Sequence, residues 1–317
     1  MMRLSVIVLA LFIAASASAA RVDTVWRITP EDGTRVTEGV STEAVRWNDG
    51  TVRIYLSTMS GERAYTSSDG LAFQPLAANL PKGTDPSLVR LSDGRWRMYY
   101  LARSPDGTSV RIMSAVSTDG LAWTDDGGVR LDISGPGKAG GVPEAVQLAD
   151  GRTRLYYIPF AKGDESIASA TSNDGLNFTQ DPGSRLTGGY VDPAVVQLSD
   201  GSFLGLFSTS PKAQQQLFIG HSADGLTWTV DPKPALDYSA NALDPTMLDL
   251  GDGTLRVYYS ISPAGQQLTG PYTVVSGILK QQALSTPPTT PEAKPKPKPV
   301  PKCKKGQKST KKAPCKK

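Results

Sequence analysis

The sequence predicts an all-β protein, a five-bladed β-propeller, and three observations lead to this fold. Five Asp-Gly hairpin signals follow one another about every 50 residues, which is the period of propeller blades. They are Asn48-Asp49-Gly50, Ser92-Asp93-Gly94, Ala149-Asp150-Gly151, Ser199-Asp200-Gly201 and Gly251-Asp252-Gly253. A second turn, of the form Ser-x-Asp-Gly-Leu-x-Phe/Trp, occurs four times between them. No apolar pattern of helical period is sustained in the 317 residues, and Gly plus Pro make up 55 of them, which excludes a coiled coil.

The first element is a secretory signal, expected over residues 1–19. Arg3 precedes an apolar run from Leu4 to Ala15, and the small residues Ala17-Ser18-Ala19 supply a cleavage site. The apolar run is shorter than the roughly 20 residues that a membrane-spanning helix needs. We therefore expect a secreted, extracellular protein without a membrane span after removal of the signal.

The propeller is expected over residues 22–280. In each blade the hairpin joins a channel-lining strand to a second strand rich in Tyr, Leu and Val. These second strands are Val52–Leu56, Trp96–Leu101, Leu155–Ile158, Phe203–Phe207 and Leu255–Ser260. The fifth unit has no Ser-x-Asp-Gly turn after Tyr272–Ser276, whereas Val25–Pro30 is similar to the outer strand Thr227–Pro232. The N-terminal strand is therefore predicted to complete blade five and close the ring.

The Ser-x-Asp-Gly turns have a structural interpretation. The Asp accepts backbone hydrogen bonds within the turn, the Gly takes a positive φ, and the aromatic residue packs between blades. The copies centre on Asp69, Asp119, Asp174 and Asp224. They resemble the Asp-box turn of sialidases, shortened by one residue.

The last element is a Lys/Pro-rich tail over residues 281–317, predicted to be disordered. Residues 280–317 hold twelve lysines against one acid, whereas residues 21–279 hold 21 basic and 29 acidic residues, so the net charge of +4 hides an acidic body. The tail is either a solvated extension or a tether to an anionic cell-wall polymer. Its Cys303 and Cys315 are the only cysteines, and export would permit a bridge between them. No nucleic-acid partner is expected, because the body has no basic, aromatic-interleaved pattern.

Carboxylates recur at the start of the channel-lining strands. Three blades have an Asp-Pro pair eight residues before the hairpin aspartate, at Asp85, Asp192 and Asp244. The other two blades have Ser41 and Val142 at this position but Glu43 and Glu144 two residues later. Because strand side chains alternate with period two, all five carboxylates are expected to face the channel. Repulsion within such a ring raises some pKa values, as a general acid near neutral pH requires.

These features together resemble a known family. The secretory five-blade pattern, Asp85-Pro86-Ser87 in blade two and the Pro-Glu strand start at Glu144 in blade three are similar to the five-bladed glycosidases of the arabinanase, β-xylosidase and fructosidase group, glycoside hydrolase family 43. The resemblance covers about residues 24–280. It implies hydrolysis of a polysaccharide by paired carboxylates, with Glu43 as the base, Asp85 as the modulator of pKa and position, and Glu144 as the acid. The family normally has an Asp in blade one, two residues before the position of Glu43.

Other residues and functions complete the expectations. Asp192, Asp244, Arg46 and Arg90 are expected to bind the substrate. No cofactor is expected to be required, no metal ligand is assigned, a central Ca²⁺ is left open, and a monomer is expected. The alternative function is a non-catalytic propeller that binds glycans or proteins at the cell surface. A sialidase-like hydrolase ranks third, on the Asp-box-like turns and the matching strand positions of Arg46 and Arg90.

Overall fold

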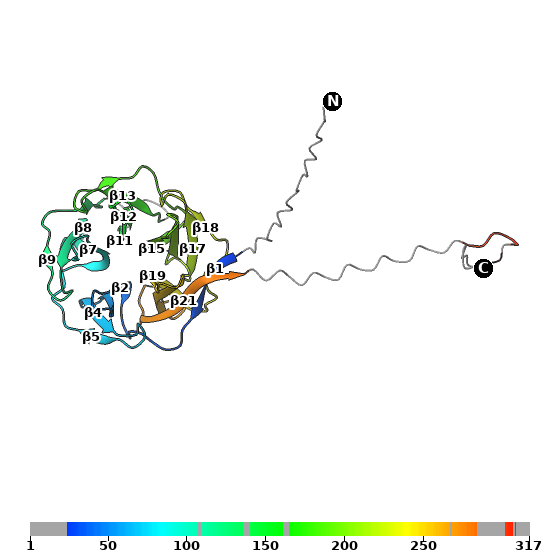
Figure 1. Cartoon of the computed structure of the whole chain (residues 1–317), viewed down its shortest axis with the longest axis horizontal. Helices are drawn as coiled ribbons and strands as arrows, with labels where there is room; N and C mark the ends of the chain where they lie inside the picture. Colours follow the sequence, from blue (N-terminus) through cyan, green and yellow to red (C-terminus); the bar gives the residue numbers. More distant parts are fainter. Residues whose placement is uncertain are drawn as a thin grey trace, which may run out of the picture. The chain divides into compact units, whose positions relative to one another are not determined.

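Five antiparallel sheets form a closed ring in the computed structural model of this chain, which confirms the five-bladed propeller (Figure 1). The structure describes residues 24–106, 109–135, 140–160, 165–266, 268–283, 302–306 and 308. The predicted signal, and the predicted tail apart from 281–283, 302–306 and 308, lie outside these residues. None of the described residues belongs to a helix that could cross a membrane. Cys303 is disulfide-bonded; the other cysteine of the chain, Cys315, lies outside the described residues.

The blades follow one another in chain order, and each begins with its innermost strand. Blade one consists of β2 (Val40–Arg46), β3 (Val52–Thr58), β4 (Gly61–Ser67) and β5 (Gln74–Leu76). Blade two consists of β6 (Thr84–Arg90), β7 (Trp96–Arg103), β8 (Val110–Ser117), β9 (Thr124–Asp125) and β10 (Leu131–Asp132). Blade three consists of β11 (Gly141–Gln147), β12 (Thr153–Ile158), β13 (Ala168–Ser172) and β14 (Thr179–Gln180). Blade four consists of β15 (Tyr190–Gln197), β16 (Phe203–Thr209), β17 (Leu217–Ser222) and β18 (Thr229–Val230).

Blade five joins the two ends of the propeller chain. It consists of β19 (Asn241–Asp249), β20 (Leu255–Ser262) and β21 (Thr273–Ala283), with β1 (Thr24–Pro30) as its outer strand. Trp26 and Val275 pack against the same buried cluster, and the Glu31 N–H donates to the Ser276 carbonyl at 2.9 Å. The predicted closure by the N-terminal strand is therefore confirmed. β21 ends at Ala283, three residues beyond the expected boundary at 280.

A fully buried tyrosine in the second strand of four blades holds the neighbouring blade. Tyr156, for example, donates its hydroxyl to the Gly225 carbonyl at 2.8 Å, and Arg154 donates to the Asp224 carbonyl at 2.9 Å. The same Arg-x-Tyr pair contacts the next Asp-Gly turn from Tyr55, Tyr99 and Tyr258. Blade four has Leu204 and Leu206 at the two positions, and blade five has no Ser-x-Asp-Gly turn for them to meet. The Arg-x-Tyr pair and the Ser-x-Asp-Gly turn that it contacts are therefore present together or absent together.

The turns themselves are held by the aspartate. In the blade-four copy, Asp224 Oδ1 accepts the N–H groups of Leu226 and Thr227, both at 2.8 Å, and these bonds lower the pKa of Asp224. Trp228 packs edge-on against Tyr156 of blade three at 6.1 Å between ring centroids. The turn thus stabilises both its own hairpin and the contact between blades.

Gly225→Ala is expected to lower the free energy of unfolding by about 1–2 kcal/mol more than Gly201→Ala. Both glycines have a positive φ, 69° and 86°, so both substitutions strain the backbone similarly. An added Cβ at Gly225 would lie 2.7 Å from the Tyr156 hydroxyl, whereas nothing lies within 4 Å at Gly201. Urea unfolding of the two variants measures the difference. Equal losses of unfolding free energy would show that the contact between Tyr156 and this turn contributes no stability.

Candidate functional site

The five innermost strands begin with an unusual backbone at the mouth of the channel. The residue eight positions before the hairpin aspartate has a left-handed backbone conformation in every blade. These residues are Ser41 (φ 49°), Asp85 (57°), Val142 (48°), Asp192 (48°) and Asp244 (49°). Each strand also shifts register at this point, for example between Gly141 and Glu144. The regular alternation that was expected here is therefore interrupted. A positive φ is uncommon outside glycine and costs most for a β-branched residue such as Val142.

Val142→Asn is expected to raise the free energy of unfolding by about 1 kcal/mol, because Asn tolerates the left-handed region that strains Val. Val129→Asn is a matched control, since Val129 is 41% exposed and has no positive φ. The control is expected to stay within about 0.5 kcal/mol of the wild type. Thermal or urea unfolding would contradict the assignment of strain if the Val142 variant were no more stable than the control.

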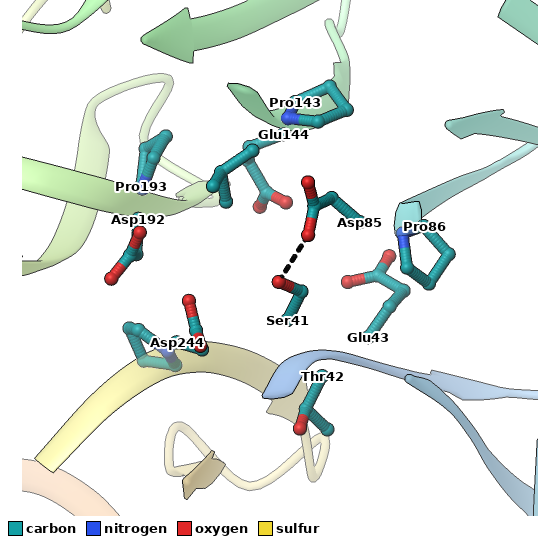
Figure 2. A pocket seen from close by; sticks show the side chains of 12 residues that line it. Ser41, Thr42, Glu43, Asp85, Pro86, Pro143, Glu144, Asp192, Pro193 and Asp244 are labelled. Atoms are coloured by element: carbon teal, nitrogen blue, oxygen red, sulfur yellow. Dashed lines mark hydrogen bonds between the residues drawn. The ribbon is translucent and has the colours of Figure 1, made fainter. Parts of the chain in front are cut away.

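The structure brings all five predicted carboxylates to one small pocket at the mouth (Figure 2). The pocket has a volume of about 20 Å³, which is room for about one water molecule. Its lining comes from all five innermost strands: Ser41, Thr42, Glu43, Asp85, Pro86, Val142, Pro143, Glu144, Asp192, Pro193, Asp244 and Pro245. Glu43 is 8% exposed, Asp192 8% and Asp244 7%, whereas Asp85 and Glu144 are partly exposed.

All three aspartates of this pocket take part in hydrogen bonds. Ser41 Oγ donates to Asp85 Oδ1 at 2.5 Å (Figure 2), and the carboxyl of Asp244 donates to that of Asp192. Burial raises the pKa of Asp85, although the Ser41 hydroxyl and the Arg103 charge oppose this. Burial raises the pKa of Asp192 to about 6. Burial and the charge of Asp192 raise the pKa of Asp244 well above its ordinary value. The Asp192–Asp244 pair therefore holds a proton in mildly acidic solution.

Glu43 and Glu144 each connect three blades. Glu43 accepts the Leu88 N–H of blade two at 2.9 Å and the Thr246 hydroxyl of blade five at 3.2 Å. Glu144 accepts the Val195 N–H of blade four at 2.9 Å and the Ser87 hydroxyl of blade two at 3.2 Å.

In two other blades, the residue that corresponds to Glu43 and Glu144 also accepts a backbone N–H of the next blade. Ser87 accepts the Ala145 N–H at 2.9 Å, and Thr246 accepts the Ala44 N–H at 3.2 Å. The side chain two residues after the left-handed residue thus accepts a backbone N–H of the next blade in four of the five blades. Glu43 and Glu144 therefore have a structural role besides any chemistry.

The two glutamates also hold protons near neutral pH. Burial raises the pKa of Glu43 to about 7, against the opposing effect of the Leu88 N–H and the Thr246 hydroxyl. Burial raises the pKa of Glu144 well above its ordinary value, and the charge of Glu43 raises it further. The charge of an ionised Glu43 favours the protonated form of Glu144. A protonated Glu144 beside an ionised Glu43 suits Glu43 as a base and Glu144 as an acid.

Arg46 and Arg90 do not lie at this pocket. They are exposed and end the strands β2 and β6, five residues beyond Ser41 and Asp85, which at about 3.3 Å per residue is roughly 17 Å away. Arg46 donates to the Gly50 carbonyl of its own hairpin at 3.3 Å. Arg90 lines the opposite end of the central channel, a cavity of about 290 Å³ that reaches Glu43 and Glu144 from the other side. The structure therefore does not bring these arginines together with the aspartates.

Two residues near the site were not predicted from the sequence. Glu62 of β4 is 8% exposed, and neither of its carboxyl oxygens has a hydrogen-bond partner. Burial and then the charge of Asp85 raise the pKa of Glu62 to about 8. The sequence could have indicated a buried Glu62, because Glu62 lies two residues before Ala64 and therefore on the same, buried face of the strand. Arg103 ends β7 and donates to the Gly140 carbonyl at 3.3 Å, and its charge lowers the pKa of Asp85; it belongs to no repeat.

Within the described part of the chain, no group of three or more His, Cys, Asp or Glu side chains has an arrangement that could hold a metal ion.

Solved structures of glycoside hydrolases share this fold. A thermostable family-43 glycoside hydrolase matches with a TM-score of 0.61 at 15% identity, over 85% of this chain and 97% of the other. An endo-arabinase from Bacteroides thetaiotaomicron matches with a TM-score of 0.61 at 14% identity, over 81% and 99%. A family-43 endo-arabinanase from Bacillus licheniformis matches with a TM-score of 0.57 at 14% identity, over 78% and 96%. The resemblance to this class of propeller is confirmed, and at these identities it concerns the fold.

No protein-family model matches the chain, and a search of curated proteins gave no significant match.

Proposed function

We propose that this protein is a secreted glycoside hydrolase that cleaves a glycosidic bond of a polysaccharide at the mouth of its channel. The observation that carries the proposal is the convergence of five carboxylates with raised pKa values on one pocket, in a fold shared with glycoside hydrolases. Glu144 gives its proton to the leaving oxygen, and Glu43, once ionised, acts as the base or nucleophile at the anomeric carbon. Asp85 modulates pKa and position, and Asp192 and Asp244 bind sugar hydroxyls.

The tail has a separate proposed role. Its lysines would hold the secreted protein to an anionic cell-wall polymer, keeping the propeller close to its polysaccharide substrate.

The test is release of reducing ends from arabinan, xylan and fructan, measured with the wild type and with Glu144→Gln side by side. We expect the wild type to hydrolyse at least one of the three and the variant to lose that activity. Failure of the wild type on all three would contradict the proposal.

Two observations favour a second function, glycan or protein binding without turnover. The carboxylate pocket of about 20 Å³ is far smaller than the roughly 300–1,000 Å³ of ordinary small-molecule sites, so a sugar ring could enter only if the mouth opened. The four oxygens of Glu43 and Glu144 also already accept hydrogen bonds between blades. Binding of a polysaccharide with no release of reducing ends would identify this function. A sialidase-like activity is not proposed, because neither Arg46 nor Arg90 lines the pocket that holds the five carboxylates.

A further inference from the structure

A large groove begins where the small carboxylate pocket ends. It has a volume of about 690 Å³, within the range of sites that bind organic ligands. Three segments of blades one and five form it together with Thr84, Asp85 and Arg103 of blade two: residues Thr37–Val40, Ser57–Ser60, and Leu268 to Tyr272. Asp85 lines both this groove and the carboxylate pocket. The two spaces therefore adjoin at Asp85.

The walls of the groove are unusually apolar for an exposed surface. Met59 is fully exposed and Leu268 is 74% exposed, and both line the groove with Pro271 and Tyr272. Only four large hydrophobic residues are exposed in the described part of the chain, and these are two of them. Exposed apolar side chains that gather in a concave site mark a binding surface, since burying them removes apolar area from water.

The polar groups of the groove suit hydroxyl groups rather than a charged ligand. Four threonines line it: Thr37, Thr58, Thr84 and Thr269. Its charged residues are Asp85 and Arg103 of blade two and Glu38 of blade one. Two acids against one base give the groove a slight negative charge, which disfavours a glycan rich in carboxylates.

We propose that this groove binds a neutral oligosaccharide chain beside the carboxylate pocket. The assignment of this ligand as a glycan rests on the function proposed above. The C–H faces of successive sugar rings pack on Met59, Leu268 and Tyr272, and their hydroxyl edges bind Asp85, Arg103 and the threonines. The groove thus supplies affinity and chain-length preference, while the carboxylate pocket supplies the chemistry.

Calorimetric titration of the full chain tests this with neutral tetrasaccharides of arabinan, xylan and fructan as probes, and with trigalacturonate as the acidic comparator. We expect at least one neutral probe to bind, and the Met59→Ala/Leu268→Ala double variant to bind it at least tenfold more weakly. The matched control is Leu121→Ala/Val129→Ala, the other two exposed hydrophobic residues, which do not line the groove. This control is expected to bind as the wild type does. All four substitutions are on exposed side chains, so the fold is retained.

The outcomes separate this inference from the hydrolase proposal. Equal binding by the groove variant and the control, tighter binding of trigalacturonate, or no binding of any neutral probe would overturn the groove assignment. Groove-dependent binding without release of reducing ends would support the groove and contradict hydrolysis. Glu144-dependent hydrolysis with a KM unchanged by the groove substitutions would support hydrolysis and contradict the groove.

Discussion

Glu144→Gln is expected to lower kcat for a natural polysaccharide by about 10²–10⁴-fold, the usual contribution of a general acid. Glutamine cannot protonate the leaving oxygen, but it keeps the contacts between blades. Its carbonyl can accept the Val195 N–H, and its amide can donate to Ser87 Oγ. The fold should therefore survive while the proton is lost. Initial rates of reducing-end release, with urea unfolding as a check on folding, measure the effect.

Two further measurements separate an acid from a merely structural glutamate. An aryl glycoside with a good leaving group needs little protonation, so the same variant should lose much less activity on it. The alkaline limb of the pH profile should disappear in the variant, because raising the pH of the wild type removes the proton of Glu144. Asp200→Asn, in an exposed hairpin of blade four, serves as the control and is expected to leave kcat unchanged. A variant with wild-type kcat on the polysaccharide would contradict the assignment.

The ring could be predicted from the sequence because its signals are local and repeated. Each Asp-Gly turn specifies a hairpin through a few neighbouring residues, and five copies at one period define the blades. The missing turn in blade five even predicted the role of β1. The left-handed residues could not be predicted, because an Asp-Pro pair such as Asp192-Pro193 is also an ordinary strand start. Two of them are held by the preceding blade, since the Asp85 N–H donates to Ser57 Oγ and the Asp244 N–H donates to Ser208 Oγ.

The site was only partly predictable for a related reason. Glu43 and Glu144 could be placed at the channel because they occupy a repeated position of the innermost strand. Arg46 and Arg90 occupy a repeated position too, but repetition does not say which end of the channel carries the chemistry. Glu62 and Arg103 approach Asp85 from β4 and β7 of two different blades, and no repeat relates them. The approach of Glu62 to Asp85 requires the packing of blade one against blade two, and that of Arg103 requires the side-chain arrangement within blade two.

Glu62 should make the protein less stable as the pH rises, and Glu62→Gln should remove this dependence. The ordinary pKa of the side chain, 4.5, applies to the unfolded chain, whereas burial and the charge of Asp85 raise the pKa of Glu62 in the folded protein to about 8. Between these values the folded protein holds a proton that the unfolded chain releases. The free energy of unfolding therefore falls as the pH rises through this window, by about 1.4 kcal/mol per pH unit and about 4 kcal/mol from pH 5 to pH 8.

Urea unfolding at pH 5 and pH 8 of the wild type and the variant measures this loss. The other raised carboxyl groups of the pocket are present in both proteins, so the difference between the two pH dependences isolates Glu62. Glu38→Gln is the control, because Glu38 is an exposed glutamate of the same part of the chain and should leave the dependence unchanged. Parallel curves for the wild type and Glu62→Gln would mean that Glu62 is ionised when folded. A buried carboxylate without a hydrogen-bond partner would then carry an uncompensated charge, the costliest arrangement available to it.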